Sequence, residues 1–269
     1  MLKRTITATI ATLLLVLILV FGKVIGAAIL FAVACAFSTY EMLTCCNLFK
    51  KWYISIPSIL FTGFCALLPA IVNHPVNLIG FMLAVIPFVL ICFLFATVVF
   101  HKSLEIESVT MFFAMALYIT AGFASLTFLA KYYLLRSVVF VFAVACTTDI
   151  FAYFCGSLFG KRKLCPTISP KKTVAGAIGG SLFGILAGGL VLWFSVGHNP
   201  LLLLIPIPLT IIGQLGDLSA SLIKRKFGVK DYGRLFPGHG GVLDRFDSII
   251  PIATVTALFY VAMSIISML

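Results

Sequence analysis

The chain has 269 residues, of which 62% are hydrophobic and only 10% are charged, and its mean hydropathy is +1.20. This composition excludes an ordinary soluble domain and is typical of a polytopic membrane protein. The formal net charge of +11 would suit nucleic acid binding, but in a membrane protein such an excess usually reflects basic cytoplasmic loops. We therefore expect no nucleic acid partner.

Long apolar runs recur along the chain and predict membrane-spanning helices. Lipid forces each span to satisfy its own backbone hydrogen bonds, and runs of this length are helices rather than barrel strands. The first run resembles a signal peptide, but no small-residue cleavage site follows it, so we expect a retained span. The predicted fold is an all-α polytopic bundle of about nine transmembrane helices. The runs cover approximately 6–22, 24–43, 54–72, 78–100, 109–130, 137–157, 174–196, 200–222 and 248–268.

The basic residues predict the orientation of these spans. With the N-terminus in the cytoplasm, alternation of the spans places 16 of the 19 lysines and arginines on the cytoplasmic side. Only Lys23, Lys131 and Arg136 then lie outside. Because cytoplasmic loops of membrane proteins carry the excess of basic residues, the count predicts a cytoplasmic N-terminus and an external C-terminus.

The acidic residues divide the chain into two parts. All five aspartates lie beyond residue 148, whereas the first half contains only three glutamates. We therefore expect residues 1–136 to form scaffold helices and residues 137–269 to form a catalytic region with two basic cytoplasmic loops, 161–173 and 224–247.

Two of the aspartates interrupt predicted spans. A carboxylate inside a span costs roughly 2.5–3.5 kcal/mol on insertion scales, so Asp149 requires either a polar cavity or a hydrogen bond to a neighbouring helix. Helical spacing places Gln214, Asp217, Ser221 and Lys224 on one face of their span. This stripe indicates the wall of a cavity open to the cytoplasm, and the alternative is a hydrogen-bonded seam between helices.

The segment "FPGHGGVLDRFDS", residues 236–248, concentrates scarce acids and glycines before the last span. Asp244 and Asp247 are expected to share a face at the helix N-terminus, and with Asp217 they would form an oxygen-rich pocket suited to Mg²⁺. A single carboxylate there would be an ordinary helix cap. The glycines around His239 would let backbone N–H groups approach an anion. For His239, general acid–base catalysis, phosphate binding and a loop hydrogen bond all stay open.

The loop 161–173 contains five cations beside Ser169 and Thr173. Lys171 and Lys172, at the mouth of the next span, are well placed to hold phosphates or anionic headgroups. The alternative is the ordinary charge of a cytoplasmic loop, which is our reading of 161–163.

Taken together, these motifs resemble the signature of phosphatidate cytidylyltransferases of the bacterial type. The pattern runs without a gap from Ser221 to Asp247, and "DIFAYFCGSLFGKRKL" with "ISPKKTVAGAIGG" resembles the region that precedes it. The first half of the chain is similar only in hydropathy. Tyr232 departs from the pattern, because bacterial members usually have serine there.

The resemblance implies the reaction of CTP with phosphatidate to give CDP-diacylglycerol and pyrophosphate in phospholipid biosynthesis. It implies CTP, phosphatidate and the lipid bilayer as partners and Mg²⁺ as cofactor, with a second cation and a homodimer left open. The enzyme would be a multi-pass protein of the bacterial inner (plasma) membrane with its active site facing the cytoplasm. The expected catalytic residues are Asp217, Lys224, Asp244, Arg245 and His239. The expected metal ligands are Asp217, Asp244, Asp247 and Asp149. The expected substrate-binding residues are Ser169, Lys171, Lys172, Thr173, Ser221, Arg225, Lys230, Asp231, Gly238, Gly240 and Gly241.

Two alternatives stay open at this point. One is a cytidylyltransferase for another lipid phosphate, such as a polyprenyl or isoprenoid-ether phosphate. The other is an ion-coupled membrane transporter, which predicts acids near the bilayer midplane and inverted repeats. Here the acids cluster toward one side and no repeat is visible.

Overall fold

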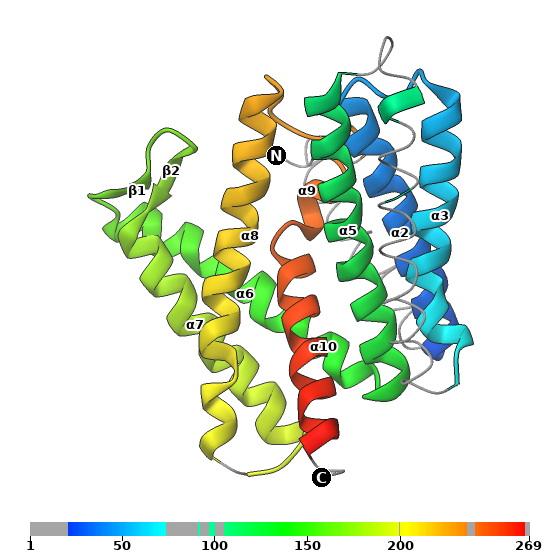
Figure 1. Ribbon diagram of the computed structural model, residues 1–269. Coiled ribbons are helices and arrows are strands. Elements are labelled where there is room, and N and C mark those ends of the chain that lie inside the picture. Colours follow the sequence, from blue (N-terminus) through cyan, green and yellow to red (C-terminus); the bar gives the residue numbers. More distant parts are fainter. Residues whose placement is uncertain are drawn as a thin grey trace. The chain divides into compact units, whose positions relative to one another are not determined.

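The computed structural model describes residues 21–73, 91, 97–99, 105–198, 200–235 and 240–266. The chain forms two compact units, the first from residues 1–131 and 232–243 and the second from 132–231 and 244–269. The described residues are mainly helical (Figure 1), which confirms the expected all-α class. The assignment of a scaffold role to 1–136 and a catalytic role to 137–269 stays a prediction.

Seven of the described helical segments are long and apolar enough to cross a membrane, so the chain is a multi-pass membrane protein. The first and fourth expected spans, 6–22 and 78–100, lie mostly outside the described residues. The segments are α2 (Lys23–Cys45), α3 (Trp52–Ile71), α5 (Ile106–Tyr132), α6 (Leu135–Phe159), α7 (Val174–Ser195), α8 (Pro206–Lys226) with the preceding 3-10 helix η1 (Pro200–Leu204), and α10 (Ile249–Ile266).

In the first unit, α2 and α3 lie side by side (Figure 1). Their contact includes a buried pair of hydroxyls, with Thr39 Oγ1 and Thr62 Oγ1 2.9 Å apart. At the C-terminal end of α3, Lys131 of α5 donates from Nζ to the carbonyl oxygens of Ala70 at 2.8 Å and Val72 at 2.6 Å. A cation at a helix C-terminus is favourable because it meets unsatisfied carbonyl groups.

In the second unit, α6 and α7 pack closely along a stripe of glycines. Gly176, Gly180, Gly184 and Gly188 recur every four residues on the buried face of α7. A Cβ at Gly180 would lie only 2.6 Å from the carbonyl oxygen of Thr148 in α6. Small residues at this spacing let two membrane helices approach until their backbones touch.

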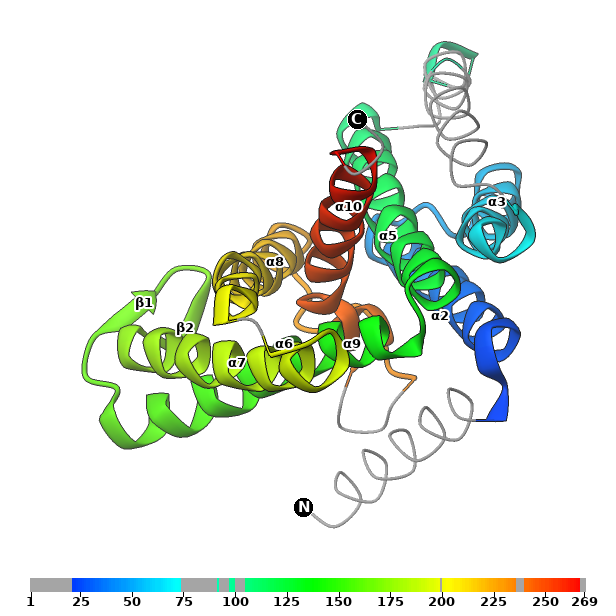
Figure 2. The same cartoon turned by 90° about the horizontal axis from the view of Figure 1, so that it is seen from below.

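Helix α8 lies against α7 and α10, and Figure 2 shows α8 and α10 as neighbours. Gln214 Nε2 donates to Ser181 Oγ of α7 at 2.8 Å. On the side of α10, Gly216 leaves room for Pro251, since a Cβ there would meet the proline ring at 2.5 Å. These contacts place the second half of α8 between the start of α7 and the start of α10.

The basic segment 161–173 is more ordered than the loop that the sequence predicted. It forms the antiparallel strands β1 (Lys163–Cys165) and β2 (Ser169–Thr173), which join α6 to α7. Thr173 then caps α7, because its Oγ1 accepts the backbone N–H of Gly176 at 3.1 Å. The hairpin therefore delivers Lys171 and Lys172 directly to the first turn of α7.

The expectation that Asp244 and Asp247 begin one helix is wrong. Asp244 belongs to the separate four-residue helix α9 (Leu243–Phe246), and Asp247 lies in the turn before α10. Asp247 Oδ1 accepts the backbone N–H of Ser248 at 2.9 Å, which helps to end one helix before the next begins. Both carboxylates are nevertheless buried.

Candidate active site

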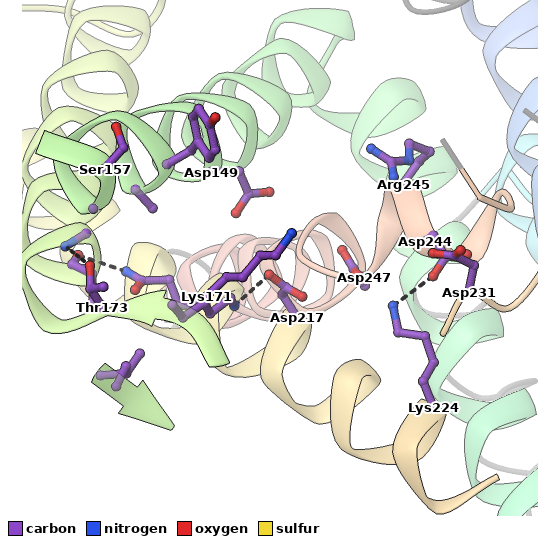
Figure 3. Close-up of a pocket in the computed structure, with 18 residues that line it drawn as sticks. Asp149, Ser157, Lys171, Thr173, Asp217, Lys224, Asp231, Asp244, Arg245 and Asp247 are labelled. Atoms are coloured by element: carbon purple, nitrogen blue, oxygen red, sulfur yellow. Dashed lines mark hydrogen bonds and ion pairs between the residues drawn. The ribbon is translucent and has the colours of Figure 1, made fainter. Parts of the chain in front are cut away.

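One cavity of about 470 Å³ in the second unit gathers all five aspartates of the chain (Figure 3). It lies among α6, the hairpin, α7, the second half of α8 and the segment around α9. The lining residues are Asp149, Ala152, Tyr153, Gly156, Ser157, Leu164, Lys171, Lys172, Thr173, Gly176, Ala177, Gln214, Asp217, Lys224, Asp231, Asp244, Arg245 and Asp247.

Charge is concentrated toward one end of this cavity. Figure 3 shows the uncharged Ser157 and Thr173 at one end and Asp244 and Arg245 at the other, with Asp217 between them. Four cationic side chains face the same space as the five carboxylates. A ligand with an uncharged part and several phosphates would match this polarity.

Two lysines form ion pairs with the two principal metal-ligand candidates. Lys172 Nζ lies 2.6 Å from Asp217 Oδ2, and both side chains are about one quarter exposed, at 27% and 25%. Lys224 Nζ lies 2.7 Å from Asp244 Oδ1, and here the side chains are only 11% and 3% exposed. Since desolvation offsets much of the attraction in a buried pair, such a pair is a better indication of function than of stability.

Ser248 connects two more of the acids. Its Oγ donates to Asp149 Oδ2 at 3.0 Å, and its backbone N–H donates to Asp247 Oδ1 at 2.9 Å. The sequence predicted that Asp149, inside a span, needs either a polar cavity or a hydrogen-bond partner. The structure provides both. Ser248 was not singled out from the sequence, although it follows directly after Asp247.

Asp247 experiences the repulsion among these acids. Its burial and, next, the negative charge of Asp217 raise the pKa of its carboxyl from 3.8 to about 7, while Lys224 acts in the opposite direction. A divalent cation in this part of the cavity would relieve that repulsion.

The donor set suits Mg²⁺, although the described residues contain no group of three or more histidine, cysteine, aspartate or glutamate side chains that could hold a metal ion. Magnesium binds oxygen ligands and usually takes only one or two protein carboxylates, with substrate phosphates and water completing its octahedron. Asp217 and Asp244, with Asp247 and Asp149 nearby in the same cavity, fit this pattern.

Several other expected site residues do not line the cavity. Ser221 contacts Asp217 only at 3.5 Å, and Arg225 NH1 donates to the carbonyl oxygen of Val229 at 3.4 Å. Gly238 and His239 lie outside the described residues. The second-unit residues expected at the site but absent from its lining are Ser169, Ser221, Arg225 and Lys230.

Gly240 and Gly241 belong to the first unit, where Gly241 lies against a carboxylate that the sequence did not mark. This is Glu41 of α2, whose side-chain oxygens accept the backbone N–H groups of Val242 and Leu243 at 2.9 Å each. An acid near the end of an apolar run was the available signal, but nothing in the sequence linked it to a segment 200 residues away.

Comparison with known proteins identifies the family. Residues 2–263 match the model of the cytidylyltransferase family, which is nearly the whole chain. The chain belongs to the cytidylyltransferase family. This cytidylyltransferase is therefore an enzyme of the nucleotidyltransferase class, and the family assignment disfavours the transporter alternative.

Curated relatives of this cytidylyltransferase are bacterial proteins named phosphatidate cytidylyltransferase. A relative from Staphylococcus haemolyticus is 37% identical over 91% of the chain and 93% of its own length. A relative from Staphylococcus epidermidis is 53% identical over 42% of the chain, and one from Brucella abortus is 48% identical over 46%. These two matches span 45% and 46% of the relatives' own lengths. Together with the seven apolar helices, the relatives support a multi-pass protein of a bacterial membrane.

Proposed function

We propose that this cytidylyltransferase transfers the cytidylyl group of CTP to phosphatidate, giving CDP-diacylglycerol and pyrophosphate. The name of the relative that matches 91% of the chain supports this reaction. The observation that carries the proposal is the cavity of the second unit, which gathers four cations and five carboxylates, with Asp217 in the middle, Asp244 and Arg245 at one end, and the uncharged Ser157 and Thr173 at the other.

The reaction joins two phosphate groups, so its main obstacle is negative charge. An oxygen of the phosphatidate phosphate attacks the α-phosphorus of CTP, and the bond from that phosphorus to the bridging oxygen of the β-phosphate breaks as pyrophosphate leaves. The attacking oxygen is already anionic, and no strong general base is needed. Catalysis then depends on in-line positioning and on neutralising charge.

The lysines and the arginine of the cavity supply that positive charge. Lys171 and Lys172 approach from the hairpin, Lys224 from α8 and Arg245 from α9. Arg245 has the planar geometry for two parallel hydrogen bonds to one phosphate, whereas a lysine acts as a movable point charge. When phosphates enter, Lys172 and Lys224 can exchange their carboxylate partners for phosphate oxygens.

Asp217 and Asp244 would hold Mg²⁺, with Asp247 and Asp149 as further oxygen donors. When bound, the ion supplies Lewis-acid stabilisation of the phosphoryl oxygens and of the leaving pyrophosphate. The residues of the chain have separate tasks: Ser248 orients Asp149, Lys172 pairs with the partly exposed Asp217, and Lys224 compensates the charge of the buried Asp244.

The depth of the cavity fits a reaction between a lipid and a water-soluble nucleotide. Helix α10 has 18 residues, about 27 Å, close to the ~30 Å hydrocarbon core, and the cavity is lined by Asp247, two residues before its start. Helix α6 has 25 residues, so it extends beyond that core by several ångströms. The cavity would then lie at the membrane–water interface. We propose that this is the cytoplasmic side of the plasma membrane, because the basic residues concentrate in the loops at this end.

Label transfer in detergent tests the proposal. Purified enzyme with Mg²⁺, phosphatidate and CTP labelled at the α-phosphate should form labelled lipid, and CTP labelled at the γ-phosphate should release labelled pyrophosphate in equal amount. Polyprenyl phosphate and an isoprenoid-ether lipid phosphate serve as competing acceptors. Preference for either acceptor would overturn the phosphatidate assignment, and absence of label transfer to every acceptor would overturn the reaction itself.

A further inference from the structure

Glu41 is a buried carboxylate of the first unit that the proposed reaction does not use. Its side chain lies near the end of α2 and is 3% exposed. Oε1 accepts the backbone N–H of Val242 and Oε2 accepts that of Leu243, both at 2.9 Å. The other two glutamates of the first half, Glu105 and Glu107, are exposed. Placing a carboxylate in an apolar span costs free energy, and the two charge-assisted hydrogen bonds offset part of that cost. The presence of Glu41 in α2 therefore requires an explanation.

Two glycines of the segment that resembles the family signature, Gly233 and Gly241, lie against this carboxylate. A Cβ at Gly233 or at Gly241 would overlap the Glu41 side chain. Neither glycine has a positive φ, so the need for glycine there comes from space and not from backbone conformation. Gly240 is different, because its φ of 81° is a left-handed conformation that favours glycine by itself.

We propose that Glu41 is a positioning residue for the reaction, a role that rests on the proposed function. Glycine-rich segments often bind anions through backbone N–H groups. In this chain the anion is Glu41 itself, so the N–H groups of Val242 and Leu243 hold a carboxylate and not a substrate phosphate. Leu243 is bonded directly to Asp244, and Glu41 therefore fixes the chain immediately before two cavity residues, Asp244 and Arg245.

Proteolysis tests the positioning without any measurement of activity. Arg234 is exposed and lies in the segment 232–243, whose end Glu41 holds, while Arg162 is exposed just before the hairpin in the second unit. In Glu41→Ala, trypsin should cleave after Arg234 about tenfold faster than in the wild type, because local opening becomes easier. Cleavage after Arg162 should not change, and Glu107→Gln should behave as the wild type. Unchanged cleavage after Arg234, with fragments identified by mass, would overturn the proposal.

Kinetics with paired variants test whether the positioning serves catalysis. Glu41→Ala should lower kcat by about tenfold or more, and Glu41→Gln, which keeps one acceptor, should retain more activity than Glu41→Ala. Gly241→Ala should be damaging in the wild type but should cost less than about twofold in the Glu41→Ala background, since the clash is gone. Gly240→Ala should cost the same factor in both backgrounds. If the fold losses of kcat in Glu41→Ala and Gly241→Ala simply multiply in the double variant, the contact between Glu41 and Gly241 does not act as proposed.

These outcomes separate this inference from the reaction that it builds on. If the wild type forms no labelled lipid, the proposed function fails and the proteolysis result still decides whether Glu41 holds the segment. If the wild type is active and both Glu41 variants match it in kcat, only the positioning role fails. If Glu41→Ala does not accumulate as folded protein, Glu41→Gln carries both measurements.

Discussion

Asp217 and Asp244 are the carboxylates on which the proposed chemistry depends most. Asp217→Asn and Asp244→Asn should each reduce turnover to less than about a tenth of the wild type, more than ~1.4 kcal/mol of barrier, because the amide removes the charge that would hold Mg²⁺ against phosphate repulsion. Label transfer from CTP at several Mg²⁺ concentrations measures this, with the exposed Glu107→Gln as control. Retention of a tenth or more in either variant would count against direct metal ligation.

The same two substitutions should differ in their effect on stability. Lys224 is only 11% exposed beside Asp244, whereas Lys172 is 27% exposed beside Asp217. Removing one partner of a buried pair leaves an uncompensated charge, so Asp244→Asn should lower the melting temperature in detergent clearly more than Asp217→Asn. An additional Lys224→Met substitution should restore most of that loss. Equal melting temperatures for the two single variants would show that burial does not govern this pair.

Ser248 should matter through Asp149. Ser248→Ala removes the hydroxyl donor from Asp149 Oδ2 and should lower kcat about 5- to 100-fold, in line with the loss of one buried hydrogen bond to a charged group. Ser264→Ala, near the far end of α10, removes a hydroxyl that donates to the carbonyl oxygen of Val261 and does not line the cavity, so it should leave turnover unchanged. Comparable turnover in the two variants would exclude an orienting role for Ser248.

At the residue scale, the sequence predicted the groups that stand out against an apolar background. The cavity contains all five aspartates together with Lys171 and Lys172. Two of these aspartates, Asp149 and Asp217, lie in spans, where a charge must face polar surroundings. Ser248 and Glu41 were missed for different reasons. A serine in a turn carries no signal of its own, and the partners of Glu41 are more than 200 residues away in the sequence.

At the element scale, the glycine stripe of α7 predicts that a glycine-to-alanine substitution will lower stability, which is the opposite of its usual effect in a helix. Replacing glycine by alanine inside a helix normally stabilises it by up to ~1 kcal/mol. Gly180→Ala should instead lower thermal stability and activity, because the new Cβ meets the Thr148 carbonyl oxygen at 2.6 Å and pushes α6 from α7. Gly63→Ala in α3 is the matched control, since its Cβ would find only ordinary contacts at 3.5 Å or more. A stability gain in Gly180→Ala would contradict the close approach.

The long helices could be predicted from the sequence and the short elements could not. Apolar runs of about 20 residues identify spans because the bilayer sets their length. Strands β1 and β2 have three and five residues, too few for an alternating pattern to be recognised. Helix α9 has four residues, and a two-residue turn at Asp247 and Ser248 separates it from α10. These short elements nevertheless deliver Lys171, Lys172 and Asp244 to the cavity.

At the scale of the whole molecule, sequence order and spatial order differ. Residues 232–243 pack with the first unit, while the residues on both sides belong to the second. Hydropathy indicates whether a segment lies in the lipid, but it does not indicate which distant segment it will pack against. The first half was expected to be scaffold, yet its Glu41 holds part of the motif that carries the family resemblance.

The orientation of the whole chain in the membrane is the last prediction. The count of 16 cytoplasmic basic residues against three outside predicts that the ends of α6 and α8 near the cavity face the cytoplasm. In a background in which the eight native cysteines are replaced, Lys226→Cys at the exposed end of α8 should react with a membrane-impermeant thiol reagent only after the cells are opened. His198→Cys, exposed beyond the opposite end of α7, should react in intact cells. CTP is made and used in the cytoplasm, so labelling of Lys226→Cys from outside would reverse the topology and leave the cavity without access to its proposed nucleotide.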